Sequence, residues 1–160
     1  INRAKEMISE GVDIIDVGGE STRPGADRVT EEIERDRVIP VITELAELGA
    51  TLSIDTTRAN IAQAAIGAGA TIVNDVSGGL ADPKMAALIA SNSNIQYVVM
   101  HWRGHSKDMQ KAAEYQNVVT EVKDELDDRV IALTKANKTP MPTTPSIVLN
   151  SKAWTSLIRP

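Results

Sequence analysis

Val12-Asp-Ile-Ile-Asp-Val-Gly-Gly-Glu-Ser-Thr-Arg-Pro-Gly25 is the most informative segment for the architecture. In it a short β-branched run ends abruptly at glycines and polar residues. Similar apolar runs recur downstream with helical periodicity between them. The alternation of the two segment types predicts a parallel sheet with helical crossovers, in which strands read as nearly continuous apolar runs. The predicted strands are residues 12–18, 51–55, 71–75, 96–101 and 146–150.

The predicted helices fill the intervals between these strands. Residues 30–48 carry apolar side chains at a period close to 3.6 residues, although Pro40 is expected to kink or divide this helix. Residues 58–68 are alanine-rich, and Asp82-Pro83 is typical of a helix start. The longest helix is predicted at 108–136, with an apolar side made of Val118, Val119, Val122, Leu126, Val130, Ile131 and Leu133.

The unit length distinguishes between two parallel α/β architectures. Five βα units in 160 residues average about 32 residues each, which matches the unit of a (β/α)8 barrel. An open doubly wound sheet is the alternative, but the Gly-x-Gly-x-x-Gly that usually follows its first strand is absent. We therefore predict an α/β fold with a partial (β/α)8 TIM barrel. Residues 1–150 are expected to form this domain, and residues 151–160 an aberrant tail.

Composition and charge exclude several classes of protein. Seventeen Lys and Arg against 22 Asp and Glu give a net charge of −5, which argues against a nucleic-acid partner. The absence of cysteine excludes disulfides and thiolate metal sites and favours a cytoplasmic location. No apolar run approaches the roughly 18 residues of a membrane span. With only two histidines and no cysteine, no protein-only transition-metal site is predicted.

Polar residues finish the predicted strands, at the edge where parallel α/β folds collect their active sites. Asp55 needs hydrogen-bond donors there, and a ligand ring with adjacent N–H groups would supply them. The alternative is that Asp55 caps the helix beginning at Arg58. Asn74 offers both a donor and an acceptor, so it could read the edge of the same ring; the alternative is a buried turn residue.

The glycine-flanked loop 18–25 has two hydroxyls and an Arg, which suit anionic oxygens. The alternative is a solvated loop in which Arg23 pairs with Glu20. His101 is either a general base or ligand, or a structurally satisfied histidine. The thioether of Met100 is either packed against a flat ring or ordinary core.

Four segments together resemble the dihydropteroate synthase family, the pterin-binding enzymes of folate biosynthesis. The likeness covers about residues 1–138 and extends toward Asn150. It implies strands 2 to 6 of a (β/α)8 barrel, in agreement with the unit length. The segments are Val12 to Gly25, Ser53-Ile-Asp-Thr-Thr-Arg58, Val73-Asn-Asp-Val-Ser-Gly-Gly79 and Val98-Val-Met-His101.

The resemblance also implies an activity. Such a transferase joins 4-aminobenzoate to 6-hydroxymethyl-7,8-dihydropterin diphosphate, giving 7,8-dihydropteroate and diphosphate, with Mg2+ assisting the leaving group. Sulfonamides would compete with 4-aminobenzoate, and the intact protein would be a homodimer.

Family roles transfer to individual residues of this chain. Asp55 and Asn74 match residues that hydrogen-bond the pterin edge, and Val76 and Met100 match apolar residues around its ring. We assign Thr22 and Arg23 to catalysis, since positive charge near the leaving diphosphate is the main requirement. The loop that covers the diphosphate and helps to form the aminobenzoate pocket matches Ser21, Thr22, Arg23, Pro24 and Gly25.

The departures from the family predict little activity for this chain alone. The family's first strand, with an Asn associated with metal and diphosphate, would precede Ile1. The later Asp-Pro-Gly-Leu-x-Phe-Ala-Lys, a downstream Lys and an Arg-x-His segment are missing, and we expect a reading-frame shift near Asn150. Two alternatives are a methyltetrahydrofolate corrinoid methyltransferase, against which the loop at residues 21–25 argues, and a noncatalytic truncated module.

Overall fold

A five-stranded parallel sheet organises the computed structural model, which describes residues 1–23, 25–107, 109, 114–136 and 147–149. The strands pair in chain order, β1-β2-β3-β4-β5. A doubly wound sheet reverses its order at a switch point, whereas successive neighbours are the arrangement of a barrel wall. The strands are β1 (Ile15–Gly18), β2 (Leu52–Asp55), β3 (Ile72–Asp75), β4 (Gln96–Val99) and β5 (Ile147–Leu149).

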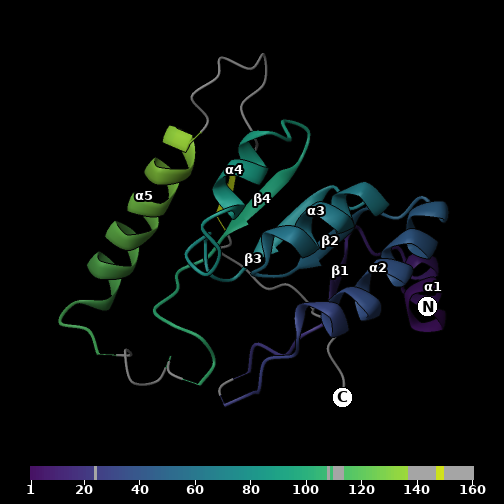
Figure 1. The fold of residues 1–160 in the computed structure, drawn as a ribbon, viewed down its shortest axis with the longest axis horizontal. Helices are drawn as coiled ribbons and strands as arrows, with labels where there is room; N and C mark the ends of the chain where they lie inside the picture. The colour runs from purple at the N-terminus through teal and green to yellow at the C-terminus, as the bar shows by residue number, and fades with distance from the viewer. Residues whose placement is uncertain (24, 108, 110–113, 137–146, 150–160) are drawn as a thin grey trace.

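Helices follow one another along the sheet, and Figure 1 shows α2 to α5 arrayed in chain order. Neighbouring helices contact each other, and α2 also packs on β1 and β2. Side chains of α2, α3 and α4, such as Ile42, Ile61 and Met85, are fully buried. The helices are α1 (Asn2–Ser9), α2 (Glu31–Glu47), α3 (Ala59–Ala68), α4 (Met85–Ala90) and α5 (Val118–Ala136).

Each strand directs alternate side chains to the two faces of the sheet. One set joins the helices in the hydrophobic core and comprises Ile15, Leu52, Ile54, Val73, Tyr97 and Val99. The other set lies on what we call the inner face and comprises Asp16, Gly18, Ser53, Asp55, Ile72, Asn74 and Val98. The apolar positions thus give the core, while the inner face is largely polar near the carboxyl ends of β1 to β3.

Two predicted boundaries were wrong, and one predicted division of a helix is absent. Helix α2 is not divided at Pro40, because Pro40 is exposed and solvent can satisfy the carbonyl that loses its partner. Helix α5 begins at Val118 rather than at residue 108, and Val118 and Val119 are exposed rather than on a buried stripe. Strand β1 starts at Ile15 rather than at Val12, since residues 12–14 form an irregular segment with a bend at Asp13. The predicted tail at 151–160 lies outside the described residues.

The hydrogen bonds at the start of α3 show whether Asp55 caps this helix. The amide of Ala59 donates to Asp82 Oδ2 at 2.8 Å, and the amide of Arg58 donates to Thr56 Oγ1 at 3.2 Å. The other oxygen of Asp82 accepts from the amide of Lys84 at 2.9 Å, but α4 begins only at Met85. Asp82 therefore caps a turn before the helix, and the predicted helix start at Asp82-Pro83 was wrong. The interpretation of Asp55 as a helix cap is therefore wrong, and its carboxylate is left for the inner face.

Candidate active site

The inner face gathers polar side chains from three neighbouring strands. The register pairs Asp16 with Ser53, and Asp55 with Asn74 one row nearer the strand ends. Asn74 Nδ2 donates to Asp16 Oδ2 at 3.1 Å, so the two side chains meet diagonally across β2. Asn74 is in a strand, which contradicts its interpretation as a turn residue.

Three polar atoms of this cluster are buried without a hydrogen-bond partner among the described residues: Asp16 Oδ1, Ser53 Oγ and Asn74 Oδ1. An unsatisfied buried polar atom costs about 1 to 3 kcal/mol. A native protein rarely keeps several such atoms side by side unless water or a ligand binds them. The cluster therefore has the chemistry of a site that accepts hydrogen bonds from a bound molecule.

Asp55 has an unusual acidity in this setting. Burial, reinforced by the negative charges of Asp16 and Asp75, raises the pKa of Asp55 to about 7. Within the described residues its carboxylate has no hydrogen-bond partner and no cation paired with it. A carboxyl group with a pKa near neutrality takes up and releases a proton near pH 7 more readily than one with an ordinary pKa.

A pocket of about 200 Å³ lies beside the strand ends. Four of the predicted residues, Ser21, Thr22, Val76 and Met100, line it together. The β1–α2 and β4–α5 connections meet there, because the amide of Gly25 donates to the carbonyl of Ser106 at 2.9 Å and Ser106 Oγ donates to the carbonyl of Ala26 at 3.0 Å. Two connections 80 residues apart thus close one side of the pocket.

Arg23 is exposed, and its guanidinium has no partner within the described part of the chain. Its proposed pairing with Glu20 is wrong, because Glu20 binds Arg28 and Arg58 instead. Arg23 is therefore available to an anion. Pro24 lies outside the described residues.

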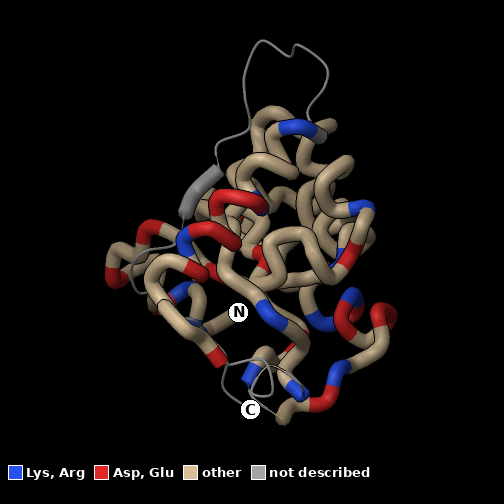
Figure 2. Tube along the Cα trace, turned by 90° about the vertical axis from the view of Figure 1, so that its left-hand side faces the viewer, with Lys and Arg blue, Asp and Glu red and all other residues tan. Residues whose placement is uncertain are grey.

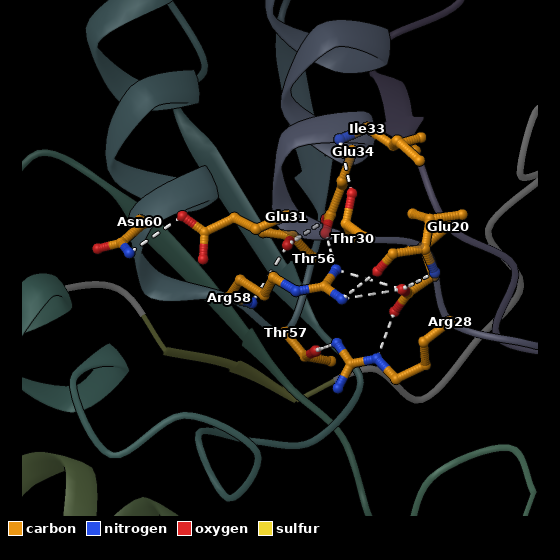
Figure 3. Close-up of polar contacts among 12 residues, drawn as sticks. Glu20, Arg28, Thr30, Glu31, Ile33, Glu34, Thr56, Thr57, Arg58 and Asn60 are labelled. Carbon is orange, nitrogen blue, oxygen red and sulfur yellow. Dashed lines mark hydrogen bonds and ion pairs between the residues drawn. The ribbon is translucent and has the colours of Figure 1, made fainter.

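A buried ionic network anchors the base of this loop (Figure 3). Glu34 of α2 is 1% exposed, accepts from Thr56 Oγ1 at 2.6 Å and pairs with Arg58. Arg58 also donates to Glu20 at 3.2 Å and to the carbonyl of Val29 at 2.7 Å. The network joins the loop after β1 to the segment after β2, which directly follows Asp55.

Arg28 completes this network at the pocket. Its Nε donates to Glu20 Oε1 at 2.9 Å, and its guanidinium also donates to Thr57 Oγ1 at 2.9 Å. All three residues line the pocket. Gly19 allows the close approach of loop and helix, since a Cβ there would lie 2.9 Å from a methyl carbon of Val38.

His101 has a hydrogen-bond partner within the protein, as expected of a structural histidine. Its Nε2 lies 2.7 Å from Glu125 Oε2. Glu125 also binds Arg103, whose guanidinium stacks 4.1 Å from the ring centre of Tyr115. Both His101 and Met100 line the pocket, so the segment after β4 contributes to its wall.

Acidic and basic side chains are interspersed along the trace in Figure 2 rather than separated by sign. Across the described residues, no group of three or more His, Cys, Asp or Glu side chains is placed to hold a metal ion.

In the same part of the chain, none of the helices combines the length and apolar character needed to cross a membrane.

Sequence reasoning missed Asp16, Arg28 and Glu34 as residues of this region. Asp16 could have been found, because it precedes Gly18 by two positions and so shares the face that Asp55 occupies in β2. Arg28 and Glu34 carried no local signal, since Arg28 binds Glu20 and Thr57, 8 and 29 positions away in sequence, and Glu34 binds Thr56, 22 positions away.

Similarity to known proteins identifies the family of the chain. The family model described as pterin binding enzyme matches residues 1–140. The chain belongs to the pterin binding enzyme family. The resemblance inferred from the four segments is thereby confirmed.

Individual relatives of this chain are similar to it over part of their length. Dihydropteroate synthase of Mycobacterium leprae (strain TN) is 54% identical over 121 residues, which are 75% of this chain and 42% of that protein. Dihydropteroate synthase of Bacillus subtilis (strain 168) is 54% identical over 101 residues, 62% of this chain and 35% of that one.

Solved structures of the pterin-binding family match the fold. Dihydropteroate synthase from Thermus thermophilus, in complex with 4-aminobenzoate, gives a TM-score of 0.81 at 38% identity and covers 92% of this chain and 54% of its own. The Burkholderia cenocepacia enzyme, complexed with 7,8-dihydropteroate, gives 0.79 at 37%, with 92% and 51% covered. The predicted partial barrel is confirmed. The chain spans about half the length or less of all four proteins.

Proposed function

We propose that the protein containing this chain is a dihydropteroate synthase, which condenses 6-hydroxymethyl-7,8-dihydropterin diphosphate with 4-aminobenzoate. The observation that carries the proposal is the inner face, where Asp55 and Asn74 lie in register beside unpaired buried polar atoms. A pterin ring presents adjacent N–H and carbonyl groups, so it can satisfy such a cluster, whereas an apolar ligand cannot. The relatives that bear this name support the choice of reaction.

The proposed roles follow from chemistry and position. Asp55 and Asn74 would hold the polar edge of the pterin, and Val76 and Met100, both in the pocket wall, would contact its flat ring. In the reaction the bond from the pterin methylene to the diphosphate oxygen breaks, and a bond to the arylamine nitrogen forms with loss of its proton.

The loop after β1 would act on the leaving group. Diphosphate departs with negative charge, and the unpaired guanidinium of Arg23 can stabilise it. Ser21 and Thr22, which line the pocket, can donate hydrogen bonds to phosphate oxygens or to 4-aminobenzoate. Pro24 and Gly25 belong to the same loop, and their roles, like sulfonamide competition at this site, rest on the resemblance.

Mg2+ does not fit a site made by the described residues, which provide no set of three metal-binding side chains. No step of the reaction is assigned to it. Mg2+ and a homodimeric intact protein stay predictions of the family resemblance.

Calorimetric titration of the chain with 6-hydroxymethyl-7,8-dihydropterin diphosphate, in buffer containing Mg2+, tests the proposal. We expect saturable heat that is lost in Asp55→Ala. Asp13→Ala removes an exposed carboxylate just before β1 and is the matched control, which should bind like the unchanged chain. Thermal unfolding of each variant establishes that it is folded. A cooperatively folded chain that gives no heat would contradict pterin recognition by these strands.

A further inference from the structure

The side-chain amide of Asn74 has a defined orientation that its own strand does not impose. Asn74 is 7% exposed, its Nδ2 donates to Asp16 Oδ2 at 3.1 Å, and its Oδ1 has no partner among the described residues. The bond spans from β3 to β1 over β2, where Ser53 is small enough to leave room. An amide with only one end bound still has its direction determined by that bond.

The carboxylate of Asp16 allows only one of the two orientations of the Asn74 side-chain amide. An ionised carboxylate accepts hydrogen bonds and cannot donate them, whereas an amide has donors on nitrogen and acceptors on oxygen. Rotating the amide of Asn74 by half a turn would set its carbonyl oxygen against the carboxylate, replacing a charge-assisted hydrogen bond by repulsion between two acceptors. Asp16 therefore binds the amide nitrogen of Asn74, and the amide carbonyl oxygen is left without a partner among the described residues.

We infer that Asp16 is a positioning residue that fixes the amide of Asn74 so that its carbonyl oxygen accepts a hydrogen bond from an N–H group of the bound heterocycle. The inference deepens the proposed function and rests on it for the identity of the ring. With Asp55 beside Asn74 in the register, this part of the inner face selects rings that present donors. Asp16 thereby determines specificity without taking a role in the reaction.

A pair of ligands that differ along one edge tests this specificity. 6-Hydroxymethylpterin has a 2-amino donor where 6-hydroxymethyllumazine has a carbonyl acceptor, and N1 of the ring changes from an acceptor to an N–H donor, so the pair exchanges the donor and acceptor positions of that edge. We expect the unchanged chain to prefer the pterin by about tenfold in Kd, the worth of one hydrogen bond. In Asp16→Asn the new amide can donate to Asn74, both orientations become available, and the preference should fall toward unity.

Two controls separate positioning from general damage. Asp13→Asn makes the same chemical change at an exposed position and should keep the preference. Asp16→Glu retains a carboxylate but displaces it, so it should weaken the preference for the pterin. This variant replaces Asp16→Asn in the test if Asp16→Asn does not fold. An Asp16→Asn chain that binds pterin and keeps the full preference would overturn the inference. If the unchanged chain binds neither ligand, the proposed function fails instead.

A measurement without ligand tests the positioning on its own. The side-chain NH2 signals of Asn74, assigned by their disappearance in Asn74→Asp, report the bond to Asp16 in a nitrogen-15 correlation spectrum. Asp16→Asn should move them and Asp13→Asn should not. Signals that stay in place in a folded Asp16→Asn chain would refute the inference whatever the chain binds.

Discussion

Glu34→Gln is the sharpest test of how the loop after β1 is anchored. Glu34 is 1% exposed and serves two partners, Thr56 and Arg58. Glutamine has nearly the same shape, so the substitution leaves no cavity; it removes the charge and replaces one acceptor oxygen by an NH2 donor. The guanidinium of Arg58 then keeps Glu20, at 3.2 Å, as its remaining carboxylate.

The magnitude follows from these contacts. Removing one partner of a buried ion pair typically costs about 3 to 5 kcal/mol, because the other charge is left uncompensated. Since Arg58 retains Glu20 and a backbone carbonyl, we expect the lower figure of about 2 to 3 kcal/mol in the free energy of unfolding.

Urea denaturation followed by circular dichroism measures this loss from the shift in the unfolding midpoint at constant slope. Glu32→Gln is the control, because it removes the same charge from the same turn of α2 at an exposed position and should change stability by no more than about 0.5 kcal/mol. If Glu34→Gln matches this control, the buried network does not stabilise the fold and the reasoning is refuted.

Three further predictions concern acidity, a buried hydroxyl and a glycine. Because the fold raises the pKa of Asp55 to about 7, the native state holds a proton that the unfolded chain releases, so stability falls as pH rises between about 4 and 7. Asp55→Asn should shrink the difference in urea midpoint between about pH 5 and pH 8; an unchanged difference would contradict the raised pKa. Tyr97→Phe removes the 2.7 Å hydrogen bond that buried Tyr97 donates to Asp75 and should cost about 1 to 3 kcal/mol in urea unfolding, and a cost near zero would show that Asp75 is satisfied without it. Gly19→Ala should cost about 1 to 3 kcal/mol because its Cβ would collide with α2, whereas Gly67→Ala, in open space within α3, should stabilise by about 0.5 to 1 kcal/mol; equal melting temperatures for the two variants would contradict the collision.

Much of the candidate site could be predicted because its residues lie at strand ends. The rule that parallel strands collect functional groups at their carboxyl ends singled out Asp55 and Asn74, and the structure sets them in register. The rule does not say which partner a side chain selects. Glu20 was expected to pair with Arg23, three residues away, yet it binds Arg58, 38 residues away.

The missed contacts share a physical cause. Hydrogen bonds and ion pairs depend on distances of about 3 Å, and these distances arise only once helices have packed on the sheet. The start of α5 was placed ten residues early for a related reason, since periodicity marks apolar residues without stating which of them have something to pack against.

The sequence by itself determined the class of fold and the family, because apolar periodicity and the order of strand-end motifs are local properties of the chain. It also determined which residue types stand at the carboxyl ends of β1 to β4. Three features could be found only from the folded chain: the order of the strands, the raised pKa of Asp55 and the hydrogen bond from Asn74 to Asp16. Desolvation and hydrogen bonding are set by what surrounds a group, and those surroundings come from segments distant in the chain.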